Sequence, residues 1–265
     1  MRSGNKSDLV HILEALINPV EVPKFCDGIV YDGAALVHTI SSRHSKTYDE
    51  YFELELKPHV SSLYAERIDF VWDLYSDKSV KLSVREGRGL GIRRQISEKS
   101  CSSSNSNTYL SNASCTDMEE ADGRIVLYAR DMATHGARCI VIRSSDTDVL
   151  ILAVSFFHSL KALGLSQLWL FFGSGNKQRF ISVHGISESL GQEKSAALRG
   201  FHAFTGCDTV SYFNGKGKRS TWKTWNSLPN ATSAFRDISI PQQVISEQIF
   251  CTLQNLSCTT NIPNA

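Results

Sequence analysis

Residues 139–157 read CIVIRSSDTDVLILAVSFF, and this stretch gives the clearest indication of the fold. The apolar run at 139–142 has the length of a buried strand, whereas the apolar run that starts at Val149 has the length of a helix. Asp146 and Asp148 stand between the two runs. Two interpretations are open: the acids cap a helix that follows a buried strand, or they hold a divalent metal at the end of a sheet.

The same order of strand and helix recurs along the chain. Strands are predicted at 24–32, 67–73 and 137–143, and helices at 33–40, 47–65 and 149–163. Pro58 predicts a kink or break in its helix, and GSGN at 173–176 predicts a hairpin turn between two apolar runs. Strands that alternate with helices favour an α/β fold with a mainly parallel sheet covered on both faces. Ligands of such sheets bind at the carboxyl ends of the strands.

Composition excludes some classes of protein and leaves others open. The chain has 265 residues, 42% of them hydrophobic, which is enough material for a sizeable core. A formal net charge of +1 indicates no particular partner, so any surface for nucleic acid must be local. The 7 cysteines include no CxxC pair, which is typical of reduced thiols in an intracellular protein. No segment approaches the roughly 20 apolar residues of a membrane span, so we expect a soluble nuclear or cytoplasmic protein with no membrane partner.

Three parts are expected along the chain. Residues 1–23 predict an N-terminal amphipathic helix, and residues 24–230 predict the α/β domain. The Ser/Asn-rich stretch at 96–114 predicts a flexible insert in that domain. Residues 231–265 predict a helical or disordered tail.

Acidic residues recur where a predicted strand ends or a predicted helix begins. They are Asp32, Asp73, Glu119, Glu120, Asp122, Asp146, Asp148 and Asp208. Taken singly, each is explained by helix capping or by the positive end of a helix dipole. Several converging carboxylates would repel one another, and their burial without a cation would be costly. Mg²⁺ and Mn²⁺ prefer carboxylate oxygens, so convergence of these acids would predict a metal centre.

Five blocks of sequence carry a resemblance to a known family. They are YDGAALV (31–37), FVWD with the basic stretch after it (70–94), EEADGRI (119–125), IRSSDTDVLILAV (142–154) and FHAFTGCDTVSYFNGKGK (201–218). In their order and spacing the chain resembles the PIN-like superfamily, specifically its flap-endonuclease branch. More closely, it is similar to uncharacterised animal proteins associated with mobile elements that carry this domain. The resemblance implies a three-layer PIN-like fold, with a central, mainly parallel sheet flanked by helices and a C-terminal helical element.

The resemblance also implies an activity. Flap endonucleases bind two metal ions through acids at matching positions, and the matching catalytic and metal-binding residues are Asp32, Asp73, Glu120, Asp122, Asp146, Asp148 and Asp208. The expected cofactor is Mg²⁺ or Mn²⁺, two ions in all. The expected function is hydrolysis of phosphodiester bonds of DNA or RNA with little base specificity. The ions would activate a water, stabilise charge on the scissile phosphate and assist the leaving oxygen.

Two basic stretches, at 76–95 and 214–225, are candidates for contact with the nucleic-acid backbone. In the first, basic residues at spacings of four and three can share one helical face, although a solvated mixed-charge helix explains them as well. In the second, glycines allow a turn whose backbone N–H groups face a phosphate. The candidate residues are Lys81, Arg85, Arg88, Arg93, Arg94, Gly215, Lys216, Gly217, Lys218 and Arg219.

Other chemically notable residues are interpreted as core. Trp222 and Trp225, spaced three apart, are expected to be buried, and His202 lies in an apolar helical context that assigns it no catalytic role. By the resemblance, the region between Arg94 and Glu119 takes the place of the arch through which flap endonucleases thread a single strand, and here it is a short run rich in Ser and Asn. Two alternatives to a nuclease stay open: a catalytically weak or inactive nucleic-acid-binding domain derived from a mobile element, and an unrelated α/β phosphohydrolase.

Overall fold

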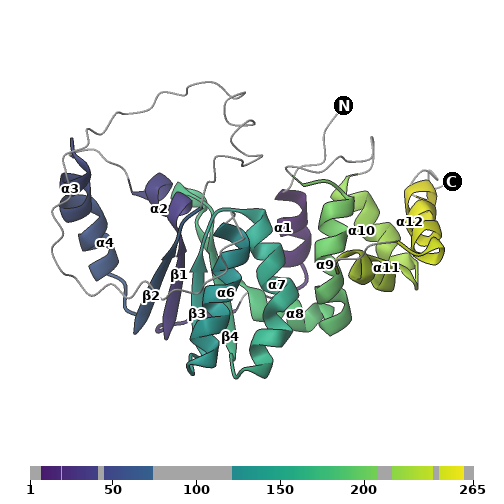
Figure 1. Cartoon of the computed structure of the whole chain (residues 1–265), viewed down its shortest axis with the longest axis horizontal. Coiled ribbons are helices and arrows are strands. Elements are labelled where there is room, and N and C mark those ends of the chain that lie inside the picture. Colours follow the sequence, from purple (N-terminus) through teal and green to yellow (C-terminus); the bar gives the residue numbers. More distant parts are fainter. Residues whose placement is uncertain are drawn as a thin grey trace.

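A five-stranded sheet with the order β2-β1-β3-β4-β5 forms the centre of the molecule (Figure 1). The computed structural model describes residues 7–18, 20–40, 45–73, 121–207, 217–240 and 245–259. The strands are β1 (Gly28–Asp32), β2 (Arg67–Val71), β3 (Cys139–Arg143), β4 (Gln167–Phe172) and β5 (Arg179–Ser182). Neighbours pair in parallel from β2 to β4, and β5 pairs antiparallel with β4. The predicted α/β class with a mainly parallel sheet is therefore confirmed.

Helices follow the strands in the predicted order. The helices before β3 are α1 (Ser7–Glu14), α2 (Gly33–Thr39), α3 (Tyr48–Tyr51), η1 (Phe52–Leu56), α4 (Lys57–Ser61) and α6 (Ala121–Thr134). Those after β3 are α7 (Thr147–Ala162), η2 (Gly175–Lys177), α8 (Val183–Leu190), α9 (Gln192–Phe204), α10 (Lys218–Ser227), α11 (Ala231–Ile238) and α12 (Glu247–Thr259). The hairpin of β4 and β5 confirms the turn predicted from GSGN.

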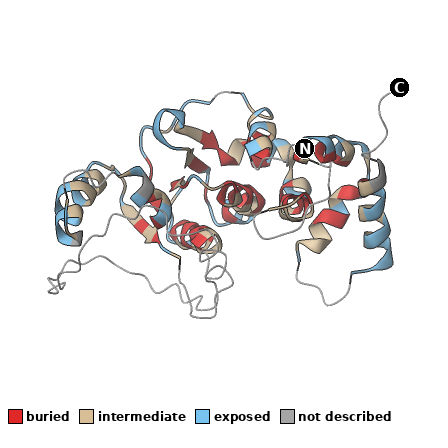
Figure 2. Ribbon diagram, turned by 90° about the horizontal axis from the view of Figure 1, so that it is seen from above, coloured by how far each residue is buried: buried red, intermediate tan, exposed pale blue. Residues whose placement is uncertain are grey.

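Alternation along β3 distributes its side chains between the two faces of the sheet. Ile140 and Ile142 belong to the main core, which includes residues of α6 and α7, and Val141 belongs to a smaller cluster on the other face. This period of two is the geometry of a strand buried on both sides. Buried residues gather in the middle of the molecule, whereas α3, η1 and α4 at one end are largely exposed (Figure 2).

The helices at the C-terminal end extend the main core. Phe201 of α9 stacks on Trp225 of α10 with ring centroids 4.9 Å apart, and both side chains are buried. Trp222 is buried as well, so the prediction for the two tryptophans is confirmed. Gly200 lets α11 approach α9 closely, because a Cβ there would lie 2.0 Å from the carbonyl oxygen of Phe235. Since Phe235 is itself in the main core, the core continues past residue 230, where a tail was predicted to begin.

Two predicted helices differ from the structure in detail. The N-terminal helix was predicted over 1–23, whereas α1 ends at Glu14; Pro19 and Pro23 disfavour a longer helix. Pro58 divides the helix predicted at 47–65, and just before it the N–H of Lys57 donates to the carbonyl of Phe52 in a wide π-type turn. The insert predicted at 96–114 lies outside the described residues.

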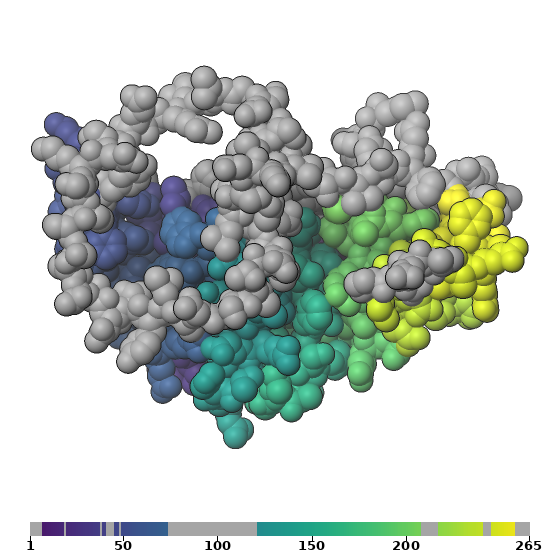
Figure 3. Space-filling model, in the orientation of Figure 1, coloured from purple at the N-terminus to yellow at the C-terminus, as the bar shows by residue number. Residues whose placement is uncertain are grey.

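The surface view places α6 and α7 in the middle of one face and α12 at one end (Figure 3). Within the described parts of the chain, no helix is both long and apolar enough to cross a membrane.

Candidate metal centre

The carboxyl ends of β1, β2 and β3 lie at one edge of the sheet, because these strands are adjacent and parallel. Asp32 is the last residue of β1, Asp73 comes soon after β2, and Asp146 comes soon after β3. We call this end of the sheet the acidic edge. Its described acids are Asp32, Asp73, Asp122, Asp146 and Asp148.

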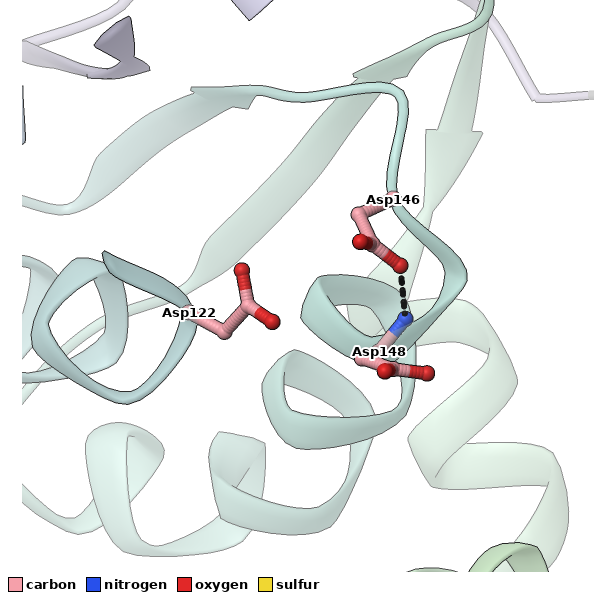
Figure 4. A group of neighbouring side chains, drawn as sticks. All are labelled: Asp122, Asp146 and Asp148. Atoms are coloured by element: carbon pink, nitrogen blue, oxygen red, sulfur yellow. Dashed lines mark hydrogen bonds between the residues drawn. The ribbon is translucent and has the colours of Figure 1, made fainter. Parts of the chain in front are cut away.

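Asp122, Asp146 and Asp148 form one cluster, the acidic group. Each offers a carboxylate oxygen, these oxygens lie within 4.8 Å of one another, and all three residues are half-buried. Asp122 comes from the first turn of α6, and the other two residues come from the start of α7 (Figure 4). Carboxylates this close repel one another when ionised, and the positive ends of the two helix dipoles offset part of that repulsion.

Asp146 confirms the capping interpretation and is compatible with the metal-binding one. Its backbone is extended, with φ −90° and ψ 134°, and its Oδ1 accepts a hydrogen bond from the N–H of Asp148 at 2.9 Å. It is therefore the N-cap of α7. One such bond does not exclude metal coordination, because a carboxylate offers about four lone-pair sites.

Asp32 is a cap and an anchor, and it is not part of the acidic group. Its Oδ1 accepts from the N–H of Ala34 at 2.9 Å and of Ala35 at 3.3 Å, which caps α2. Its Oδ2 accepts from the buried hydroxyl of Ser144 at 2.7 Å, and the Ser144 oxygen in turn accepts from the N–H of Asp146 at 3.1 Å. Asp32 thus connects the end of β1 to the turn that carries the acidic group.

Asp73 has a comparable role at the other helix. Its Oδ1 accepts from the N–H of Ala121 at 2.9 Å, so it satisfies an amide at the start of α6 from 48 residues away in the sequence. Asp122 is the next residue along α6. The contact fixes the first turn of the helix that presents Asp122. Of the seven predicted ligands, Glu120 and Asp208 lie outside the described residues.

His202 is a site residue that the sequence interpretation missed. Its Nε2 lies 2.7 Å from Oδ1 of Asp148, although the two residues are 54 positions apart in the sequence. His202 is 6% exposed, as expected for a core histidine, yet its ring contacts the acidic group. In the sequence, a histidine of an apolar helix that is simply buried looks the same as one that contacts a carboxylate.

Lys218 was expected to contact phosphate, whereas the structure buries its side chain. It is 1% exposed, and its Nζ donates to the carbonyl of Gly206 at 2.8 Å and to Oγ1 of Thr205 at 3.0 Å. The carbonyls at the end of α9 need donors, and this ammonium supplies them. Arg219 is exposed and pairs with Asp8 of α1 at 3.0 Å. The remaining candidates outside the described residues are Lys81, Arg85, Arg88, Arg93, Arg94, Gly215 and Lys216; Gly217 precedes α10 in an extended conformation.

A cation lies on the other face of the sheet, at the end of β3. The guanidinium carbon of Arg143 is 5.5 Å from the centre of the Tyr31 ring and 4.9 Å from that of Phe171, in cation–π geometry. Burial, and then the charge of Arg143, lower the pKa of His59, so this imidazole is neutral at pH 7. The acidic group and Arg143 therefore lie on opposite faces at the same end of β3.

The chemistry of the acidic group fits a hard divalent cation. Mg²⁺ and Mn²⁺ prefer carboxylate oxygens, and the group offers three carboxylates within reach of a single ion. The helix N-termini hold two of these carboxylates by backbone position, and His202 contacts the third. The acidic group can thus bind a divalent metal.

Comparison of the chain with protein families, with curated proteins and with solved structures found no match.

Proposed function

We propose that this chain is a metal-dependent nuclease of the PIN-like, flap-endonuclease type, which hydrolyses phosphodiester bonds of DNA or RNA with two Mg²⁺ or Mn²⁺ ions. The observation that carries the proposal is the acidic group at the carboxyl end of a mainly parallel sheet. Ligand sites of α/β sheets occur at this end, and three adjacent carboxylates suit a hard cation.

The protein's own residues have distinct tasks in this proposal. Asp122, Asp146 and Asp148 would hold one ion. The family resemblance assigns Asp32, Asp73, Glu120 and Asp208 to a second ion; of these, Asp32 and Asp73 also accept the hydrogen bonds that hold α2 and α6. Divalent ions bound here would supply a nucleophilic water and neutralise charge on the scissile phosphate. Asp148 is held by the imidazole of His202, and Asp146 by the amide of Asp148. These contacts fix the ligand positions before a substrate arrives, which is the basis of electrostatic preorganisation.

Little base specificity follows from the same chemistry. The carboxylates at the acidic edge would bind the phosphate through cations. Phosphates are the same in every nucleotide, so these contacts do not distinguish bases. Binding is therefore expected to weaken as the salt concentration rises.

The direct test incubates the full chain with labelled flap, single-stranded and duplex substrates, with Mn²⁺, with Mg²⁺ or with a chelator. Cleavage is expected only with metal, and the double variant Asp146→Asn/Asp148→Asn is expected to abolish it. These substitutions remove two charges while asparagine still serves as an N-cap. Asp237→Asn is the matched control, since it removes a carboxylate on α11, outside the acidic group.

Three other results would each change the assignment. Cleavage that persists in the double variant comes from a contaminating nuclease and contradicts the proposal. Oligonucleotide binding without cleavage in any metal identifies the catalytically inactive binding domain instead. Turnover of small phosphate esters without cleavage of nucleic acid identifies the unrelated phosphohydrolase.

A further inference from the structure

Trp72 differs from the other tryptophans of the chain in its exposure. The chain has 4 tryptophans, of which Trp169, Trp222 and Trp225 are 2%, 8% and 2% exposed, whereas Trp72 is 46% exposed. An indole of this size in contact with water is uncommon, because tryptophan is on average strongly buried. A binding role for the indole would account for this exposure.

One face of the indole lies against a glycine. A Cβ on Gly33 would be 2.3 Å from Cε3 of Trp72, 2.4 Å from Cδ2 and 2.8 Å from Cζ3. These three atoms are consecutive in the six-membered ring and lie at similar distances, so Gly33 meets the face of the ring, not its edge. One face of the six-membered ring thus lies against backbone, and 46% of the residue is still exposed to solvent.

Two hydrogen bonds to α6 hold the chain at Trp72 and at the residue that follows it. The carbonyl of Trp72 accepts from Nη1 of Arg124 at 2.8 Å, and the carboxylate of the next residue, Asp73, accepts from the N–H of Ala121. The donors belong to the first turn of α6, which also presents Asp122. Trp72 and the acidic group are therefore both connected to the N-terminal end of α6.

The glycine is tied to the same edge through a second route. Gly33 follows Asp32, whose carboxylate accepts from Ser144, and Ser144 accepts from the amide of Asp146. Trp72 thus follows β2 at the acidic edge, and its ring lies against Gly33, the residue that follows β1.

We propose that Trp72 is a stacking platform for an unpaired nucleobase of a single strand whose phosphate would be held at the acidic group through a divalent cation. This inference rests on the proposed function. It adds a contact with the nucleobase, which the metal-binding carboxylates do not contact. Every base has a π-face, so stacking adds affinity without base specificity. It also favours a strand whose bases are unstacked and accessible.

The test uses the fluorescence of the full chain with a short oligothymidylate, and Ca²⁺ replaces Mn²⁺ to slow cleavage during the titration. The oligonucleotide is expected to quench Trp72, and a strand of the same length with abasic sites is expected to bind more weakly and quench less. Trp72→Leu should weaken binding of the base-bearing strand by roughly 5- to 150-fold, the range for loss of one stacked base, and should leave the abasic strand nearly unaffected.

Three further variants separate stacking from a folding defect. Trp72→Phe keeps a stacking ring and should retain most of the affinity while losing the quenching. Gly33→Ala keeps the indole but displaces it, because the added Cβ collides with the ring, and should reproduce the selective loss. Trp169→Phe is the matched control: this tryptophan is buried in the sheet, so quenching by the oligonucleotide should persist.

The outcomes distinguish this inference from the nuclease proposal. Equal weakening of base-bearing and abasic strands by Trp72→Leu, or no weakening of either, overturns the stacking platform. If cleavage still depends on Asp146 and Asp148 in that case, the nuclease proposal stands alone. If the selective loss is found but no metal supports cleavage, the platform stands and the nuclease proposal fails.

Discussion

The acidic edge contains two kinds of aspartate that look the same in the sequence. Asp32 and Asp73 accept hydrogen bonds from backbone amides and hold α2 and α6 in place. Asp122, Asp146 and Asp148 bring their carboxylates together. Capping stabilises a fold, whereas close carboxylates destabilise it until a cation binds. Position at a strand end therefore does not by itself define a metal ligand, and neither does a capping bond, because Asp146 caps α7 and still belongs to the acidic group. The approach of other carboxylates makes the distinction.

The largest expected effect comes from removing a capping aspartate. Asp32→Ala leaves three donors without their acceptor, in a place where Asp32 is 7% exposed. We expect the free energy of unfolding to fall by about 2–4 kcal/mol, because buried donors lose bonds to a charged acceptor. Urea denaturation in the presence of a chelator measures this value without any contribution from metal.

Asp32→Asn is the matched variant for this measurement. Its amide oxygen can still cap α2, so the loss should be smaller, about 1–2 kcal/mol. If Asp32→Ala unfolds at the same urea concentration as the unchanged chain, Asp32 is no structural anchor and the division between the two kinds of aspartate fails.

The second effect concerns the acidic group. Without metal, loss of one of its carboxylates should not lower the free energy of unfolding, in contrast to loss of Asp32. Asp122→Asn removes one of three neighbouring charges, so its free energy of unfolding in a chelator should match or slightly exceed that of the unchanged chain. Mn²⁺ at about 100 times its dissociation constant should stabilise the unchanged chain by about 2.7 kcal/mol, and Asp122→Asn should lose most of this gain. Urea denaturation at matched Mn²⁺ concentrations measures both terms.

Asp237→Asn again provides the control, since a carboxylate on α11 should alter neither term. Equal stabilisation of the unchanged chain and of Asp122→Asn by Mn²⁺ would show that the ion binds elsewhere.

The smallest expected effect tests the link between His202 and the acidic group. His202→Leu removes the contact with Oδ1 of Asp148 and should weaken Mn²⁺ binding by about tenfold, or about 1.4 kcal/mol, as is typical for residues that orient a metal ligand. His202→Gln keeps a hydrogen-bond donor and should recover part of the affinity. Titration of Mn²⁺ followed by its electron paramagnetic resonance signal measures the free ion directly.

A purely structural histidine would give a different pattern. His158→Gln is the comparison, because His158 on α7 contacts the carbonyl of Ser187 in place of a carboxylate. Should His202→Leu and His158→Gln change Mn²⁺ affinity equally, His202 does not position Asp148.

The order of strands and helices from β1 to β5 follows from local patterns and agrees with the prediction for the described residues. Apolar runs such as 139–142 and 149–157 differ in length and period, and these properties are already present in the unfolded chain. The ends of helices were predicted less well, as at α1, where prolines and tertiary packing decide the last turn. The core beyond residue 230 was missed because the contact between Gly200 and α11 is invisible in a linear pattern.

The candidate site was predicted in its location but not in its composition. Parallel strands bring their carboxyl ends together, so Asp32, Asp73 and Asp146 had to share an edge. Whether two carboxylates approach within a few ångströms depends on how α6 and α7 pack against each other and against the sheet. Lys218 illustrates the same limit, because a basic residue next to glycines predicts an exposed charge and only the end of α9 explains its burial.

Local sequence patterns are enough to predict the α/β class, the mainly parallel sheet and the acids at its carboxyl edge, because side-chain period and the succession of strands and helices are properties of short segments. Only the tertiary structure decided that three of those acids gather, that His202 reaches Asp148 across 54 residues, and that Trp72 rests against Gly33. These contacts join residues from separate elements. Their distances depend on how whole helices pack together, and no single element contains that information.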